Sequence, residues 1–574
     1  MEYLSYPYQF SRHQTRTVQI GNIAIGGSNP IVIQSMLTSL TSDANSCFKE
    51  ILSLVNVGCQ LIRLTIPSLK DLEYIAQLRY LMQEEGIIVP LVADVHFSPN
   101  IAVAACEFFE KVRINPGNYT DVSKNSKKHH GAEWFEVGRE NLKEAIIPLV
   151  KQLKYYRRAL RIGVNHGSLS TRMIEKYGDS PRGMVESALE MINLFEAKGF
   201  DQLVVSLKSS NPVVVQKAYR LLVDHSPGKE AVPLHLGVTE AGNGIAGRVK
   251  GLAGIGSLLI DGIGDTIRVS LTEESQNEIV FAQKLLHGIG SYRSKDKIDN
   301  NRWQREINHQ RIINPSIIVD GIEIGNGTPL KLGILKGTTL DVEKNRSEID
   351  FEYQIKKNNI FILGNKKRLQ LPNDFSADSD LSDLPDYDGI IVENSANTLY
   401  LLRKHYKAFS INKPVGMFYP LRDSEAETLF LETQLSAILS EGLLDFLLIP
   451  KNINANQLER AFYLLQATRS KIFFPDYIAC PSCGRTLFDL QLATQKIKKA
   501  TSHLKGVKIG IMGCIVNGPG EMADADFGYV GSGRGKIDLY LGQQQIKKGV
   551  DEQNAVDDLV DLIKENGRWI DPPI

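Results

Sequence analysis

Three features are scarce or missing in this chain of 574 residues. Six cysteines in so long a chain are too few for a disulfide framework. Net charge is zero, because 66 Lys and Arg balance 66 Asp and Glu, so no global field attracts nucleic acid or an anionic membrane surface. No uninterrupted apolar run approaches the roughly 18 to 20 residues that cross a bilayer. We therefore expect a protein with no nucleic-acid partner and no membrane partner.

The first residues also lack a targeting pattern. The start, MEYLSYPYQFSRHQTR, does not have the basic-then-apolar order of a signal peptide, which predicts a cytoplasmic protein. Hydrophobic residues make up 43% and charged residues 23%, an ordinary globular composition that excludes a chain disordered or collagen-like throughout. At roughly 100 to 200 residues per domain, the length predicts about three to five domains.

Eight strand–helix pairs occupy the first half of the chain. Between about residues 30 and 290, short β-rich runs alternate with stretches of 3.6-residue apolar periodicity. The runs are PIVIQSM, LIRLTIP, VPLVADVH, KVRINPGN, LRIGVNHG, QLVVSLKSS, PLHLGVTEAG and DTIRVSL. Eight such pairs predict an α/β fold, a TIM (β/α)8 barrel, over residues 1–290. An open doubly wound sheet gives the same alternation but usually carries a Gly-rich fingerprint after its first strand, which PIVIQSMLTS lacks.

The second half of the chain divides in two. Residues 291–314 are polar and predict a linker, after which KLGILK, NIFILG, DGIIVENS, PVGMFYP and LLDFLLIP alternate with helical stretches. We interpret residues 291–470 as this linker and a second, inserted α/β domain. Residues 471–574 hold a CPSC pair, a helical stretch, the strand VKIGIMGC, a glycine-rich loop and a hairpin around GSGRGK, which predicts a small α+β domain.

Three of the six cysteines fall in that last segment. Cys480 and Cys483 form a CxxC pair, but a zinc ribbon needs a second such pair, and the chain offers only Cys514 downstream. Three thiolates fit a 4Fe-4S cluster better, and Glu521 is a candidate fourth ligand. The alternatives are a redox dithiol or incomplete zinc site at CPSC and a buried cysteine at position 514. The other cysteines lie in apolar helical stretches and predict small hydrophobic side chains: Cys47, Cys59 and Cys106.

Basic and amide residues occur on the predicted barrel strands, where Val, Ile or Leu are usual. They are Arg63, Arg113, Asn115, Arg161, Asn165, Lys208 and Arg268. Residues two apart on a strand face the same side, so Ser270 shares a face with Arg268. Buried cations need partners, and the carboxylates on these strands are chiefly Asp94 and Glu240. Any single Arg can instead face a helix, but the cationic excess predicts a polyanionic ligand such as a diphosphate.

Catalytic groups of TIM barrels stand at strand ends, and two of the predicted strands end in ionisable residues. Glu240 closes PLHLGVTEAG, and a carboxylate among cations can donate or accept a proton. Asp94 and His96 close VADVH. A lone His is more often structural than catalytic, so we assign no catalytic role to His96 or His166. The glycines of GLAGIGSLL and GSGRGK lack phosphate-loop spacing and predict helix packing and a hairpin turn.

Eight segments of the chain resemble one known family. They are VIQSM, VADVHF, VRINPGN, GVNHGSL, LHLGVTEAG, GIGDTIRVSL, IACPSCGR and GCIVNGPGE. The family is that of the 4-hydroxy-3-methylbut-2-enyl diphosphate synthases, enzymes of the methylerythritol phosphate route to isoprenoids. The resemblance covers about residues 30–290 and 475–540. Two-domain members have nothing like residues 315–470, so the chain looks like the longer, insert-containing form, as in the plant type.

The resemblance implies a reaction, a cofactor and a site. The reaction is the two-electron reduction of 2-C-methyl-D-erythritol 2,4-cyclodiphosphate, with ring opening and loss of water, and the electron donor is ferredoxin or flavodoxin. The implied ligands of a 4Fe-4S cluster are Cys480, Cys483, Cys514 and Glu521, and Glu240 matches an acid–base glutamate. The implied diphosphate clamp comprises Arg63, Arg113, Asn115, Arg161, Asn165, Lys208, Arg268 and Ser270. In two-domain relatives a partner subunit's cluster domain closes over the barrel, so a homodimer is also implied unless the insert changes that geometry.

Two other interpretations of the residues are open. One is a non-redox TIM-barrel transferase for a phosphorylated substrate, similar to dihydropteroate synthases, whose cysteines bind structural zinc. The other is a binding module in which CPSCG is a zinc ribbon, although zero net charge and the missing second cysteine pair argue against it. The inserted domain carries no cysteine, and we interpret it as a structural spacer, with a docking surface for the electron donor as the alternative.

Overall fold

The computed structural model of the chain describes most of its residues. The described ranges are 12–95, 98–120, 132–226, 231–291, 314–336, 348–355, 360–363, 367–370, 388–395, 397–407, 411, 413–480, 486–515 and 518–572. Most of the predicted linker, residues 292–313, therefore lies outside the described part of the chain. Within the described ranges, no helix is long and apolar enough to cross a membrane.

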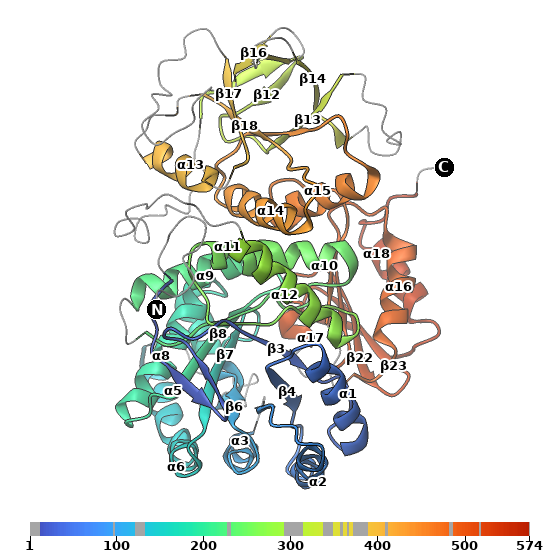
Figure 1. Ribbon diagram of the computed structural model, residues 1–574. Coiled ribbons are helices and arrows are strands. Elements are labelled where there is room, and N and C mark those ends of the chain that lie inside the picture. The colour runs from blue at the N-terminus through green and yellow to red at the C-terminus, as the bar shows by residue number, and fades with distance from the viewer. Residues whose placement is uncertain are drawn as a thin grey trace.

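The first domain is a barrel of parallel strands, drawn in blue to green in Figure 1. Its described strands are β3 (Val32–Met36), β4 (Leu61–Thr65), β5 (Leu91–Asp94), β6 (Lys111–Ile114), β7 (Ala159–Asn165), β8 (Leu203–Lys208), β9 (His235–Leu236) and β10 (Thr266–Ile267). The order β8-β7-β6-β5-β4-β3-β10-β9 follows the chain, and a bridge between Val205 and Leu234 joins its two ends. The predicted TIM barrel is confirmed, and each predicted run overlaps one strand.

Helices surround these strands. They are α1 (Ala44–Asn56), α2 (Asp71–Glu84), α3 (Pro99–Ala105), α4 (Pro116–Tyr119), α5 (Ala132–Ala145), α6 (Ile147–Tyr156), α7 (Thr171–Tyr177), α8 (Pro181–Ala197), α9 (Pro212–His225), α10 (Gly244–Gly251), the π-helix η1 (Leu252–Gly256), α11 (Ser257–Ile260) and α12 (Ser275–Ser291). Helix α2 illustrates the pattern, because Leu72, Ile75, Leu78 and Met82 line its buried face at helical spacing. The main core lies between such faces and the outer side of the strands.

A short hairpin closes the bottom of the barrel. Strands β1 (Val18–Ile20) and β2 (Ile23–Ile25) are antiparallel, and their apolar side chains pack against the first inward residues of the barrel strands. Those residues are Val32, Leu61, Val92, Ala159 and Val204. The sequence analysis missed this hairpin because three-residue strands carry too little periodicity. With the floor closed, the mouth at the carboxyl ends of the strands is left for a ligand, as in other TIM barrels.

The inserted domain forms a second, mixed barrel above the first (Figure 1). A hairpin of β11 (Ile317–Val319) and β12 (Ile322–Ile324) precedes it. Its described strands are β13 (Lys331–Leu335), β14 (Phe351–Ile355), β15 (Ile360–Leu363), β16 (Lys367–Gln370), β17 (Gly389–Val392), β18 (Val415–Phe418) and β19 (Phe446–Ile449), with helices α13 (Thr398–Lys407), α14 (Glu425–Ser440) and α15 (Ala455–Ala467). The five predicted strands are confirmed, and β14 and β16 complete the ring.

A buried ring of charges joins the insert to the barrel. Arg220 of α9 and Arg403 of α13 contact the same two carboxylates, Asp261 and Glu441. The four N–O distances lie between 2.5 and 2.8 Å, and each side chain is at most 8% exposed. Burial opposes ionisation of Asp261, but the guanidiniums of Arg403 and Arg220 outweigh it and hold its pKa below the ordinary value. This ring fixes the insert to the side of the barrel formed by α9 to α12.

The C-terminal domain is a five-stranded sheet of the described residues, covered by helices and drawn in red in Figure 1. Its elements are β20 (Asp476–Ala479), α16 (Leu490–Thr501), β21 (Lys508–Met512), α17 (Gly518–Glu521), β22 (Phe527–Gly533), β23 (Lys536–Leu541), β24 (Gln544–Asp551) and α18 (Ala555–Glu565). Strands β20 to β22 are parallel, and β22 to β24 are antiparallel. The predicted α+β domain and the hairpin around GSGRGK are confirmed.

Candidate active site at the barrel mouth

Three arginines on neighbouring strands converge on one carboxylate inside the barrel. Arg113 Nη1 donates to Asp94 Oδ1 at 3.2 Å, and Arg161 Nη2 lies 3.7 Å from the same oxygen. Arg63 Nε lies 3.8 Å from Asp94 Oδ2. The strands pair in parallel register, with Asp94 opposite Arg113 and Arg113 opposite Arg161, which is why the side chains meet. These four buried groups together carry net positive charge.

The field of these cations acts on the other bases of the barrel. Burial, together with Arg63 and Arg113, lowers the pKa of Arg161, although Asp94 opposes the shift. Burial and the surrounding arginines also lower the pKa of Lys208 at the end of β8. A bound anion stabilises the protonated form of these crowded bases, because it supplies the negative charge that the site lacks. The mouth is therefore suited to a polyanion.

Two basic residues of the interior were missed by the sequence analysis. Lys111 lies on β6 below Arg113, and His235 lies on β9, where its Nδ1 is 3.1 Å from Arg161 Nη1. Burial and nearby cations lower the pKa of both, so the His235 ring is neutral and Nδ1 accepts from Arg161. Lys111 has the same parity as Arg113 in KVRINPGN, and that spacing was the signal that could have found it.

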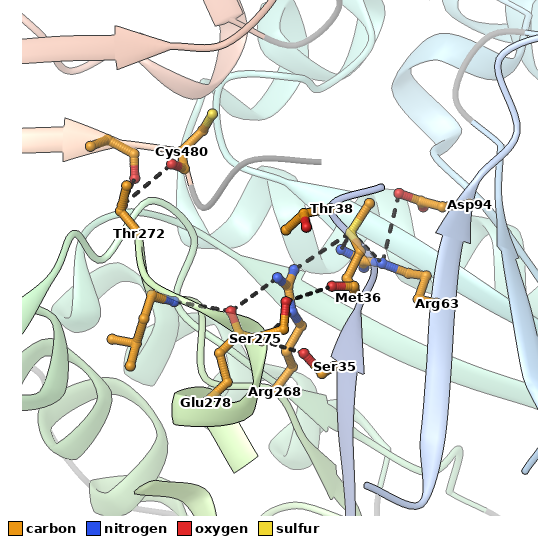
Figure 2. Close-up of polar contacts among 12 residues, drawn as sticks. Ser35, Met36, Thr38, Arg63, Asp94, Arg268, Thr272, Ser275, Glu278 and Cys480 are labelled. Carbon is orange, nitrogen blue, oxygen red and sulfur yellow. Dashed lines mark hydrogen bonds and ion pairs between the residues drawn. The ribbon is translucent and has the colours of Figure 1, made fainter. Parts of the chain in front are cut away.

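Arg268 has a carboxylate of its own. Glu278 on α12 contacts it with two hydrogen bonds, in addition to the strand carboxylates Asp94 and Glu240 that the sequence indicated. The sequence analysis considered strand residues alone, and Glu278 reaches the barrel interior from a helix. Figure 2 shows it beside Arg268, on the opposite side of Met36 from Arg63 and Asp94.

The remaining predicted substrate contacts lie at the same end of the barrel. Asn165 is opposite Lys208 in the register of β7 and β8, and both side chains are buried. Asn115 caps α4 by accepting from Gly117 N at 3.1 Å, while its buried Nδ2 has no hydrogen-bond partner among the described residues. The Ser270 side chain is buried beyond β10.

Glu240 follows β9 in a strained backbone conformation. Its φ is +49°, in the left-handed region that non-glycine residues rarely adopt, and its side chain is buried. The next residue, Ala241, forms a parallel bridge with Ala479 of the C-terminal domain. Strain of this kind persists where surrounding contacts hold it, often at functional sites.

The C-terminal domain covers the mouth of the barrel of its own chain. Thr272 Oγ1 donates to the carbonyl oxygen of Cys480 at 3.3 Å (Figure 2). On another side of the mouth, Gly167 and Gly520 approach so closely that a Cβ on Gly167 would lie 1.8 Å from Gly520 O. Lys498 Nζ donates to Asn243 Oδ1 at 2.6 Å. The two domains therefore meet within one chain.

Two of the four predicted cluster ligands are described. Cys480 follows β20 and Cys514 follows β21, and these strands are parallel neighbours, so the two cysteines leave the sheet at the same edge. Both are half-buried, and Gly513 N donates to Cys480 Sγ at 3.3 Å. Backbone N–H groups aimed at sulfur suit a thiolate that holds a metal. The donor set therefore fits an iron–sulfur group.

Other predicted residues lie outside the described part of the chain: Cys483, the side chain of Glu521, and His96. Among the described residues, His, Cys, Asp and Glu form no group of three that could hold a metal ion. The cysteines predicted to be hydrophobic are buried, and burial raises the pKa of each thiol to about 12: Cys47, Cys59 and Cys106.

Comparisons with known proteins find relatives over nearly the whole chain. Residues 15–283 match the family described as GcpE TIM-barrel domain, and residues 476–565 match GcpE protein C-terminal domain. The chain is 39% identical to the 4-hydroxy-3-methylbut-2-en-1-yl diphosphate synthase (flavodoxin) of Akkermansia muciniphila, with 99% of each chain covered. It is 38% identical to the protein of the same name from Leptospira interrogans, covering 99% of this chain and 98% of that one. A solved dihydropteroate synthase from Xanthomonas albilineans is 12% identical over 47% of this chain and 98% of its own, with a TM-score of 0.31.

Proposed function

Because the chain belongs to the GcpE family, we infer that it catalyses the reaction of the 4-hydroxy-3-methylbut-2-en-1-yl diphosphate synthases. It reduces 2-C-methyl-D-erythritol 2,4-cyclodiphosphate by two electrons, opening the ring and releasing water, in isoprenoid biosynthesis. The relatives carry flavodoxin in their names, so flavodoxin is the donor among the two that the sequence left open. The observation that carries this function is a buried cationic mouth covered by a domain with two cysteines at one sheet edge.

The family implies an iron–sulfur cofactor, and we propose that it is a 4Fe-4S cluster held by Cys480, Cys483, Cys514 and Glu521. Support comes from the common sheet edge of Cys480 and Cys514 and from the Gly513 N–H that Cys480 Sγ accepts. When bound, the cluster supplies the two electrons of the reaction. The protein's part would be to hold it against the barrel mouth, and the Thr272 contact to Cys480 O supports that role.

The proposed diphosphate clamp consists of Arg63, Arg113, Asn115, Arg161, Asn165, Lys208, Arg268 and Ser270. These residues share the carboxyl end of the barrel strands, and guanidiniums grip phosphate oxygens bidentately. A ring C–O bond breaks more readily when the departing phosphate oxygen is neutralised, which preorganised cations do without further reorganisation. The buried Nδ2 of Asn115 is available as a further donor.

Glu240 is the proposed acid–base residue. The reaction consumes two protons and two electrons as it releases one water molecule, so a proton donor is required at the leaving oxygen. Glu240 is buried just after β9, directly before the residue that bridges to the C-terminal domain. That position is next to a contact between the barrel and the C-terminal domain.

We propose three domains with the predicted boundaries, residues 1–290, 291–470 and 471–574, since each sheet is made of strands from one of these ranges. A homodimer, implied by the resemblance, is not needed to bring the cluster domain to a barrel, because both lie in one chain here. The cytoplasmic location stays a prediction from the sequence.

The test of this function is anaerobic purification, followed by iron and sulfide analysis, EPR of the reduced protein, and turnover of the cyclodiphosphate. We expect four irons and four sulfides per chain, lost in Cys480→Ser, and product formation with reduced flavodoxin. Zinc without sulfide would contradict the function and favour the non-redox transferase.

A further inference from the structure

One carboxylate at the barrel mouth comes from a helix and is fully engaged. Glu278 lies in the first turn of α12 and is 3% exposed. Its Oε1 accepts from Arg268 Nη2 at 3.2 Å and from Leu271 N at 3.1 Å. Its Oε2 accepts from Arg268 Nε at 3.3 Å and from Ser35 Oγ at 2.7 Å. Both oxygens are thus used twice, and the carboxylate cannot rotate without losing bonds.

This engagement fixes which edge of Arg268 is available. The Nε and Nη2 edge is taken by Glu278, so the remaining terminal nitrogen, Nη1, points elsewhere. Its one described contact is a weak one, to Met36 Sδ at 3.7 Å. A guanidinium held by a bidentate carboxylate on one edge keeps its free edge in a single direction.

Contacts on the Arg63 side of the mouth also restrict the orientation of the Arg268 guanidinium, through Met36. Met36 Sδ also accepts from Arg63, at 2.7 Å from Nη2 and 3.1 Å from Nε. Figure 2 shows Glu278, Arg268, Met36, Arg63 and Asp94 in a row. Two guanidiniums therefore flank one neutral thioether, and a carboxylate lies on the outer side of each. Each outer carboxylate holds its own guanidinium by opposite charge and so offsets the repulsion between the two cations.

Glu278 also ties the clamp to the domain contact. Its bond to Leu271 N holds the backbone between Ser270 and Thr272, and Thr272 Oγ1 donates to Cys480 O. The carboxylate thus reaches the clamp and the closing domain through two separate bonds.

We propose that Glu278 is a positioning residue, which holds Arg268 in the orientation that receives a diphosphate group. The proposal rests on the proposed function in taking Arg268 as a diphosphate ligand. Neither Glu278 nor Met36 touches the substrate in this scheme. Glu278 acts through Arg268, and Met36 keeps the two guanidiniums apart.

The direction in which one substitution changes the affinity for diphosphate distinguishes this positioning role from simple charge balance. Glu278→Gln removes a negative charge from the mouth, so charge balance alone predicts tighter binding of a diphosphate. Positioning predicts weaker binding, because the amide places a donor against Arg268 Nε or Nη2 and releases the guanidinium. Glu278→Asp keeps the charge and shortens the side chain, and positioning predicts weaker binding there also.

The experiment measures inorganic diphosphate binding to the anaerobically purified full chain by calorimetry, and KM and kcat for the cyclodiphosphate. We expect both Glu278 variants to bind diphosphate about tenfold more weakly and to raise KM by a similar factor, because a bidentate charge-assisted contact is lost. Iron content and the EPR signal should match the parent protein, and kcat should change less than KM. Ser35→Ala, which removes one bond to Glu278 and leaves the charge, should weaken binding in the same direction by a smaller factor.

Glu432→Gln is the matched control. Glu432 is equally buried and contacts Arg460 in the inserted domain, away from the mouth. Unchanged or tighter diphosphate binding in Glu278→Gln, or an equal loss in Glu432→Gln, overturns the proposal. If the parent protein binds diphosphate but does not turn over the cyclodiphosphate, the proposed function fails while the binding comparison still decides the role of Glu278.

Discussion

At the scale of single residues, the barrel interior is unusual because it is charged where most TIM barrels are apolar. Burying a cation is costly unless it is paired, and here three arginines share one carboxylate. The cost is consistent with a site that gives up stability for anion binding. Two predictions follow from single side chains.

The first concerns Lys111, which is fully buried and whose Nζ has no hydrogen-bond partner among the described residues. Burial, with Arg161 and Arg63, lowers its pKa from 10.5. Between that lowered pKa and 10.5, the unfolded chain therefore holds more protons than the folded chain, and stability rises with pH through that window. We expect Lys111→Met to raise the free energy of unfolding by about 1–4 kcal/mol at pH 7, and by less at pH 9.5. Urea unfolding at the two pH values measures this, and a less stable variant at pH 7 would count against it.

The second prediction concerns Lys208 and the protons that the protein takes up when it binds diphosphate. Burial and the four arginines of the proposed clamp lower the pKa of Lys208, and a diphosphate bound there should raise it again. Binding should therefore take up protons, and affinity for inorganic diphosphate should fall as pH rises through the lowered pKa. Calorimetry in two buffers of different ionisation enthalpy measures the uptake. Lys208→Met should reduce it, and an unchanged uptake would point to another group.

At the scale of elements, close backbone contacts decide where helices and domains meet. In η1, a Cβ on Gly254 would lie 2.2 Å from Val238 Cγ2, and a Cβ on Gly256 would lie 2.5 Å from Thr433 Cγ2 of α14. The glycines of GLAGIGSLL thus serve helix packing, as the sequence analysis predicted. One of them faces the barrel and the other the inserted domain.

The turn after β7 gives a prediction at this scale. Gly167 has φ +80° and touches the backbone of Gly520, whereas Gly178 has φ +74° and has open space where its Cβ would be. Both glycines have positive φ, so alanine carries backbone strain at either position, but only Gly167→Ala also blocks contact with the C-terminal domain. We expect Gly167→Ala to keep its iron and to lose about tenfold or more in kcat, because the reacting groups are misplaced. Gly178→Ala should retain near-parental kcat, and equal losses in both variants would refute a role for the contact.

At the scale of the whole molecule, the insert contacts both other parts of the chain. The buried ring joins it to the barrel, and Lys471 Nζ lies 2.5 Å from Asp350 Oδ2 near the segment that leads into β20. Arg469 and Lys250 both contact Asp476 at the start of β20, at 2.7 and 2.9 Å. These contacts support the interpretation of the insert as a structural spacer that holds the C-terminal domain in position at the barrel mouth.

Arg403→Met tests the buried ring. The variant leaves Asp261 and Glu441 with Arg220 alone, and we expect it to lower the free energy of unfolding by about 3–5 kcal/mol at pH 7. The low pKa of Asp261 gives stability that is present above its unfolded value near 3.8 and is lost as pH falls through its folded value. The difference between parent and variant in urea unfolding should therefore narrow below about pH 4. Arg182→Met, at an exposed pair with Glu186, is the control and should change stability by less than about 1 kcal/mol.

Closure within one chain predicts the result of mixing two inactive variants. Cys480→Ser damages the proposed cluster site, and Arg268→Met damages the proposed clamp. If each barrel is closed by its own C-terminal domain, a mixture of the two variants should show no more turnover than the sum of the turnovers of the two variants measured separately. Recovered activity in the mixture would mean that domains are exchanged between chains.

The sequence by itself determined the barrel, its eight strands and the family, because each depends on local periodicity, spacing or motifs. It also placed Arg268 and Ser270 on one face of their strand. Only the tertiary structure decided which carboxylate each arginine contacts and which barrel the C-terminal domain covers. Glu278 and Ser35 are 243 residues apart and meet through the closed ring of strands. Contacts of that separation leave no periodic trace in the chain, since they depend on how complete elements pack.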